Sequence, residues 1–256
     1  MRNLMFVVLL HLFALVGCGG QAPLASKGAK WFDFTEPLNE RLLRKSASVA
    51  ELAKLKSVKL DLGANSAIVD SDLAAIKNLQ NLVVLELYLT SITDQAMEHL
   101  VNLPLEVLSV NQTQLGDKGL ETIGKIKTLR RLELFDTKVT DAGLTHLSNL
   151  PLFRIDLSKT AVTNAGMTDV AKINGLERLI VNQTAISDEG LAIIGTITTL
   201  QELDISQAGA ITDVGLKHLY NLKSLRALFL GDSKYSPEGL KELRRALPVA
   251  QIAAND

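Results

Sequence analysis

The sequence contains few of the residues that usually carry binding or redox chemistry. Aromatic residues make up 4% of the 256 residues, with one Trp and three Tyr, so few rings are available to stack on bases or sugars. Cys18 is the single cysteine, which excludes an intramolecular disulfide and a thiolate-rich metal site. The formal net charge is only −1, and a chain so balanced lacks the basic field that attracts nucleic acid. These absences favour a role based on packing and surface contact.

Short motifs of common enzyme sites are also missing. We find no P-loop, no G-x-G-x-x-G opening a helix, no H-E-x-x-H and no G-x-S-x-G. His99, His146 and His218 occupy the same position in separate repeated units, where even the nearest pair would lie about 10 Å apart or more, too far to share a metal ion. We therefore expect no enzyme activity, no metal site and no cofactor. An enzyme would need a ligand that brings its own chemistry.

The N-terminal segment has the pattern of a secretory signal. A short positive start precedes an apolar run from Leu4 to Val16, which is too short to span a bilayer comfortably and is typical of a signal-peptide core. The run ends in Leu-Val-Gly-Cys-Gly over residues 15–19, which resembles the lipobox of bacterial lipoproteins. This resemblance implies acyl chains on Cys18 and attachment to a membrane of the cell envelope without crossing it. An ordinary signal peptide with an unmodified Cys18 is the alternative.

Composition divides the chain into five parts. Residues 1–17 are the predicted signal peptide, and residues 18–30 are small and polar, as expected of a lipidated tether. Residues 31–56 carry leucines in helix-like spacing and are predicted to form an N-terminal helical cap, with Trp31 sealing the core or, alternatively, exposed as a ligand anchor. Residues 57–247 hold eight repeats, and residues 248–256 are expected to form a C-terminal cap strand and tail.

Each repeat changes its hydrophobic period partway through. In Leu132-Glu133-Leu134 alternate residues face opposite sides, as in a strand, whereas Leu144, Leu147 and Leu150 follow at helical spacing. The second strand leucine recurs at steps of 23 to 25 residues, in Leu60, Leu85, Leu108, Leu132, Ile155, Leu179, Leu203 and Leu228. Such a period predicts stacked units that share one core.

The repeated pattern L-x-x-L-x-L, followed by a turn and a helix, resembles the leucine-rich repeat family. The resemblance implies an α/β fold, a right-handed solenoid curved like a horseshoe, with short parallel strands on its concave face and helices on its convex face. Two units are similar to the F-box, cysteine-containing subclass, as in Ile-Thr-Asp-Val-Gly-Leu at 211–216. The cysteine ladder and an F-box segment are absent, so the adapter function of that subclass is not implied.

Three further columns are predicted to be structural. Hydroxyl residues mark helix starts, and an acid on the first turn suits the helix dipole, as in Thr140-Asp141. Buried threonines are expected to satisfy turn carbonyls, namely Thr90, Thr113, Thr137, Thr160 and Thr184. Glycines before the first inward helix residue are expected to allow close packing of units, namely Gly119, Gly143, Gly166, Gly190, Gly215 and Gly239.

Outward strand residues form the candidate binding surface on the concave face. An acidic column lies beside three consecutive arginines and a few aromatic rings, a mixture typical of protein interfaces. The candidate residues are Asp61, Glu86, Tyr88, Arg131, Glu133, Phe135, Arg154, Asp156, Arg178, Asp204 and Phe229. We therefore expect a membrane-anchored module that binds or scaffolds a protein partner of unknown identity. Two alternatives stay open: a carbohydrate or cell-wall binder using the same face, and a solvated sheet whose charges cancel.

Overall fold

A computed structural model describes residues 58–254 apart from 210, 232 and 233. The predicted signal peptide, the lipidation site Cys18, the tether and the N-terminal cap lie outside the described residues. Within the described part of the chain, no helix is both long and apolar enough to cross a membrane.

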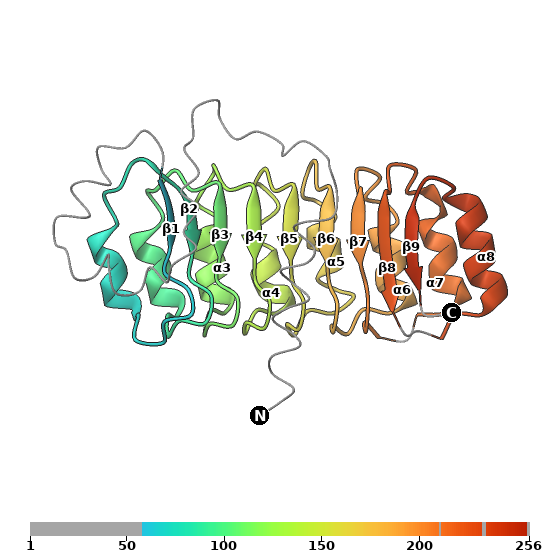
Figure 1. The fold of residues 1–256 in the computed structure, drawn as a ribbon, viewed down its shortest axis with the longest axis horizontal. Coiled ribbons are helices and arrows are strands. Elements are labelled where there is room, and N and C mark those ends of the chain that lie inside the picture. The colour runs from blue at the N-terminus through green and yellow to red at the C-terminus, as the bar shows by residue number, and fades with distance from the viewer. Residues whose placement is uncertain (1–57, 210, 232–233, 255–256) are drawn as a thin grey trace. The chain divides into compact units, whose positions relative to one another are not determined.

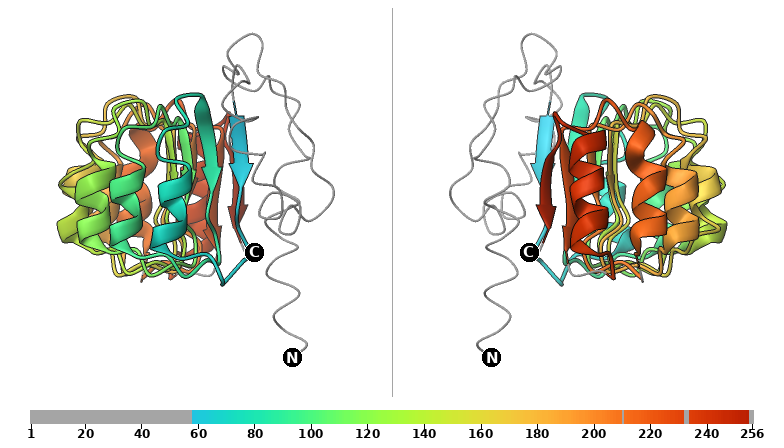
Figure 2. Two further views of the ribbon diagram at one scale, coloured as in Figure 1. Left: turned by 90° about the vertical axis from the view of Figure 1, so that its left-hand side faces the viewer. Right: turned by 90° about the vertical axis from the view of Figure 1, so that its right-hand side faces the viewer.

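Nine parallel strands form one open sheet whose strand order follows the sequence, β1 to β9 (Figure 1). Their bounds are β1 Val58–Asp61, β2 Leu82–Glu86, β3 Val107–Ser109, β4 Arg131–Glu133, β5 Arg154–Asp156, β6 Arg178–Ile180, β7 Glu202–Asp204, β8 Ala227–Gly231 and β9 Gln251–Ala254. The helices cover one face of this sheet (Figure 2). On the opposite side the end strands β1 and β9 project beyond the central strands, so the strand face is concave (Figure 2). The predicted α/β solenoid is confirmed.

Helices follow the strands in every complete unit, but they differ in type. Their bounds are η2 Asp70–Ala75, η3 Asp94–His99, α3 Asp117–Ile123, α4 Asp141–Leu144, α5 Met167–Val170, α6 Asp188–Ile194, α7 Asp213–His218, η4 Leu219–Asn221 and α8 Pro237–Ala246. The first two, η2 and η3, are 3-10 helices, and the units from α3 onward contain α-helix. Six of these nine helices start at an Asp, and in five of the six a hydroxyl residue or glycine precedes it; the exception is η2, which follows Val69.

The core is continuous from the first described unit to the last. In the fourth unit Leu132, Leu134, Leu144, Leu147 and Leu150 are all at most 2% exposed. The equivalent positions of the other units join them in one apolar cluster that extends from Leu60 to Leu247. Because burial of one such leucine contributes about 1.5–3 kcal/mol, stacking of neighbours is what stabilises each unit.

The threonine column satisfies turn carbonyls, as predicted. Thr137 is buried, and its hydroxyl donates a hydrogen bond to the carbonyl oxygen of Leu134 at 2.7 Å. Thr90, Thr113, Thr160 and Thr184 make the same bond to the residue three positions earlier. Each threonine therefore pairs a carbonyl at the end of its own strand.

The acids at helix starts connect neighbouring units, a role that the helix dipole alone does not explain. Asp117 accepts hydrogen bonds from the backbone N–H of Thr140 at 2.8 Å and from its hydroxyl at 2.7 Å. The same pair of hydrogen bonds, one from the backbone N–H and one from the hydroxyl, joins Asp70 to Thr93, Asp141 to Thr163, Asp188 to Thr212 and Asp213 to Ser236. We call this series the aspartate ladder.

The glycine column makes room for the aspartate ladder. A Cβ atom on Gly143 would lie 2.5 Å from Asp117 Oδ1 and 2.9 Å from Leu120 Cδ1, both too close for van der Waals contact. The predicted reason for these glycines, close packing of units, is confirmed, and the atoms that require it are now identified.

A left-handed turn follows the first seven strands without using glycine. The backbone φ lies between 54° and 57° at Ala64, Leu89, Gln112, Asp136, Lys159, Gln183 and Gln207. A non-glycine residue in this conformation costs about 1–2 kcal/mol. Part of that cost is offset by a hydrogen bond to the next unit, such as the 2.7 Å bond from Gln112 N–H to the carbonyl of Phe135. These turns were not predicted from the sequence.

Candidate functional site

Strand register places equivalent outward residues directly beside one another. Arg131, Arg154 and Arg178 are consecutive partners across β4, β5 and β6. We call these three residues the arginine row. Glu133 and Asp156 are partners in the same strands, two positions further along. The predicted neighbouring stripes of arginine and acid therefore exist in the folded chain.

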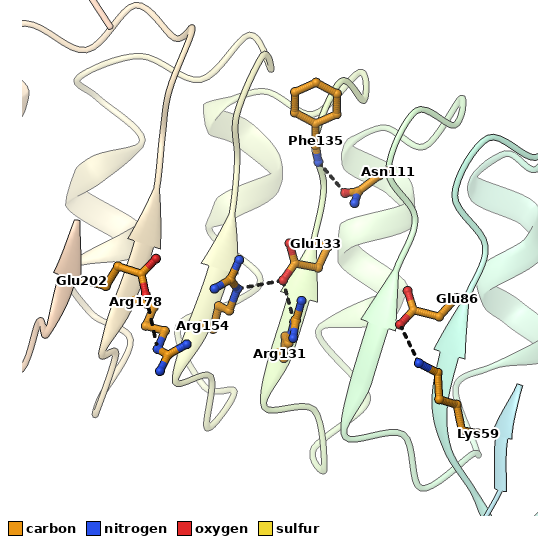
Figure 3. Close-up of polar contacts among 9 residues, drawn as sticks. All are labelled: Lys59, Glu86, Asn111, Arg131, Glu133, Phe135, Arg154, Arg178 and Glu202. Atoms are coloured by element: carbon orange, nitrogen blue, oxygen red, sulfur yellow. Dashed lines mark hydrogen bonds and ion pairs between the residues drawn. The ribbon is translucent and has the colours of Figure 1, made fainter. Parts of the chain in front are cut away.

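One carboxylate holds two members of the arginine row. Glu133 Oε1 accepts from Arg131 Nε at 2.6 Å and from Arg154 Nε at 2.9 Å (Figure 3). The side chain of Glu133 is 7% exposed, against 36% for Arg131 and 18% for Arg154. Because its partners are charged and it is largely removed from water, this is a stronger contact than an ordinary surface ion pair.

Asp156 lies beside this cluster in an environment that disfavours its negative charge. It is 2% exposed. Burial and, after it, the negative charge of Glu133 together raise the pKa of Asp156 to about 7, against the opposing effects of Ser158 and Arg154. The carboxyl therefore exchanges its proton near neutral pH. For Arg154 burial opposes the charged form, but the nearby Glu133 carboxylate outweighs it and raises the pKa, so the guanidinium stays charged.

Three acids of the concave face have a structural task that the sequence analysis missed. Asp61, Asp156 and Asp204 each accept the backbone N–H of the residue two positions later, at 2.9 Å. Such a bond fixes the turn that follows the strand. The pattern Asp-x-Gly or Asp-x-Ser at the strand end was the available signal. Part of the acidic column therefore reflects turn formation.

The remaining charged candidates pair with residues that were not among the predicted site. Arg178 Nε lies 3.6 Å from Glu202 Oε2, and Glu86 Oε1 lies 3.8 Å from Lys59 Nζ (Figure 3). Burial raises the pKa of Glu86, while Lys59 acts in the opposite direction. Lys59 and Glu202 occupy the same column as the arginine row, on β1 and β7, which is the signal that could have identified them.

The three aromatic candidates do not come together. Tyr88 follows β2 and packs against Gly63, where any Cβ atom would strike its ring. Phe135 follows β4; its N–H donates to Asn111 Oδ1 at 2.8 Å, and the Lys159 ammonium lies 5.8 Å from its ring centroid. Phe229 is 39% exposed on β8. The structure thus joins Arg131, Glu133, Arg154 and Asp156 in one patch, with the other candidates distributed along the sheet.

This arrangement suits recognition of charged groups. Guanidinium groups held in place by carboxylates bind anions with defined geometry. No group of three His, Cys, Asp or Glu residues within the described ranges could hold a metal ion.

Fold and site together define an α/β leucine-rich-repeat solenoid with a charged concave face. The leucine rich repeat family model matches three segments of the chain, residues 101–124, 125–148 and 196–219. No curated protein matches the chain. Among solved structures, internalin C2 of Listeria monocytogenes is similar, with 24% identity and a TM-score of 0.59 over 80% of this chain and 84% of that one. A second internalin of Listeria monocytogenes, inlF, has 20% identity and a TM-score of 0.55 over 83% of this chain and 72% of its own. At this identity the likeness concerns the fold.

Proposed function

We propose that this protein is a lipid-anchored module of the cell envelope that binds a protein partner on its concave face. The observation that carries the proposal is the arginine row. Its three residues are in register on adjacent strands and their side chains are between 18% and 42% exposed. Arginine is among the residues most often found at the energetic centre of protein interfaces.

The repeat itself does not require arginine at these positions. The equivalent residues are Val84 on β2, Val107 on β3 and Ala227 on β8. The sheet can therefore form without arginine at these positions. A binding role would explain why three long cationic side chains lie beside Glu133.

Attachment to a membrane is supported by the sequence around Cys18. The lipobox-like residues follow a positive start and an apolar run of signal-peptide length. Acylation at Cys18 would hold the solenoid at a membrane surface, where its concave face could meet an envelope protein.

A carbohydrate-binding role has weaker support. Tyr88, Phe135 and Phe229 follow or lie on β2, β4 and β8, and strands in a sheet are spaced by about 4.8 Å, so at least two strand spacings separate any two of these rings. They do not form one stacking platform for a sugar chain.

The test is capture of a partner from envelope extract by the full chain and three variants. Arg154→Glu and Phe135→Ala should each weaken capture, by up to about tenfold. Because Arg154→Glu also removes the partner of the largely buried Glu133, circular dichroism confirms that each variant is folded at the temperature of the assay. Lys217→Glu on the exposed helical side is the matched control and should leave capture intact. Capture that survives both concave changes but is lost in the control variant would place the interface on the convex face and overturn the proposal.

A further inference from the structure

We infer that the arginine row binds carboxylates presented on successive turns of an acidic α-helix of the partner protein. The inference rests on the proposed function, because it places the partner on the same face, and it adds the chemistry and the conformation of the partner segment. Four observations lead to it: the register of the arginines, their unused donors, their spacing and the charges around them.

The strand register places three positively charged side chains next to one another, which is unfavourable by itself. Arg131 lies directly beside Arg154, and Arg154 directly beside Arg178. Like charges opposite one another on neighbouring strands destabilise a sheet. Glu133 compensates for one such pair, and Glu202 lies within 4 Å of Arg178 without a hydrogen bond. The arrangement becomes favourable when further carboxylates approach the row.

The guanidinium donors needed for this are available. Arg131 and Arg154 use only Nε toward Glu133, and their terminal nitrogens donate to no other described residue. Each therefore presents a fork of N–H groups that matches a carboxylate. Since Nε of Arg131 and of Arg154 is fixed on the same oxygen, the two forks are held in place before a ligand arrives.

Spacing distinguishes a helix from an extended peptide. Strands are about 4.8 Å apart, so two steps from Arg131 to Arg178 cover about 9.6 Å. Two turns of α-helix rise about 10.8 Å, close to this span. In an extended peptide the side chains on one face repeat every 6.6–6.8 Å or so, and two repeats cover about 13 Å. Carboxylates at positions i, i+4 and i+7 of a helix therefore follow the row, and those of an extended segment do not.

Neighbouring charges favour a local acidic helix over a long polyanion. Glu86, Glu133 and Asp204 lie in the column beside the row, and Glu202 continues the row itself on β7. An extended polyanion that crosses the sheet would meet these carboxylates and be repelled. A helix that carries acids on a single stripe places them over the arginines only.

The test uses two synthetic helices of about 15 residues, rich in alanine so that they are helical in solution. One carries Glu at i, i+4 and i+7, and the matched peptide has the same composition with its three Glu on different faces. We expect fluorescence anisotropy to show that the full chain binds the first peptide at least tenfold more tightly. Arg154→Gln and Arg178→Gln should each remove most of this preference, whereas Lys217→Gln should keep it.

Each outcome bears on the inference. Arg154→Lys, which keeps the charge without the fork, should recover only part of the preference if the fork is what recognises the carboxylate. Equal affinity for both peptides, or stronger binding of poly-glutamate than of the striped helix, would overturn the inference. A partner captured through the concave face but insensitive to competition by the striped peptide would also overturn it, and would leave the proposed function standing. Circular dichroism of each variant separates loss of binding from loss of fold.

Discussion

Replacing Asp156 by Asn isolates the energetic cost of a buried charge on the concave face. Asparagine has nearly the same shape, carries no charge and keeps the oxygen that accepts the Ser158 N–H. Burial is the main reason that the pKa of Asp156 is raised from 3.8 to about 7. The substitution therefore removes the titration and leaves the turn in place.

The sign of the effect follows from proton binding. Below pH 4 or so the carboxyl is protonated in both the folded and the unfolded chain, so ionisation costs no stability. Between about 4 and 7 only the folded chain keeps the proton, and stability falls as the pH rises. Above 7 the full penalty applies, which for a shift of about 3 pKa units is at most about 4 kcal/mol. The increase in the free energy of unfolding that Asp156→Asn produces relative to the parent should therefore be about 2–3 kcal/mol larger at pH 8 than at pH 5.

Urea unfolding of the full chain, followed by circular dichroism at both pH values, measures this difference. Asp204→Asn is the matched control, because Asp204 makes the same turn hydrogen bond in a half-exposed position. A stability difference between Asp156→Asn and the parent that is equal at pH 5 and pH 8 would refute the reasoning. So would a variant that is less stable than the parent at both.

Two further predictions concern attachment and packing. Cys18→Ala should prevent lipid modification and leave the chain unprocessed or released from the membrane. Mass spectrometry of the mature N-terminus measures the modification. An unmodified Cys18 in membrane-extracted protein would contradict the lipoprotein prediction. Gly143→Val should lower the free energy of unfolding by about 1–3 kcal/mol, because its side chain would meet Asp117 and Leu120, whereas exposed Lys138→Ala should change it little. Equal melting curves for the parent and both variants would show that our account of the glycine column is wrong.

The fold was predictable because its signal is repeated in every unit. Leu132 and Leu144 each have counterparts at nearly constant spacing, so the strand, the helix and their inward faces could all be assigned from periodicity. The patch of Arg131, Glu133 and Arg154 could also be predicted, because parallel strands in register place equivalent residues side by side.

Features that depend on the backbone path were not predictable in the same way. Nothing in Leu89 or Gln112 signals a left-handed turn, since the residue types differ from unit to unit and only the position is shared. The 3-10 helices of the first two units occur where the glycine column is occupied by Asp72 and Ala96. The residue type at this one position in the sequence did not by itself predict the tighter helix.

The aspartate ladder gives the stack a direction. Each of its acids accepts hydrogen bonds from the hydroxyl residue at the helix start of the following unit. Each unit therefore provides a carboxylate to the unit after it and receives one from the unit before it. In the last helix the position after Ser236 is Pro237, which has no acceptor on its side chain. The C-terminal unit can therefore receive a neighbour's carboxylate but cannot offer one. A repeat inserted before α8 would find this contact available on both sides, whereas a repeat placed after α8 would have to stack without it.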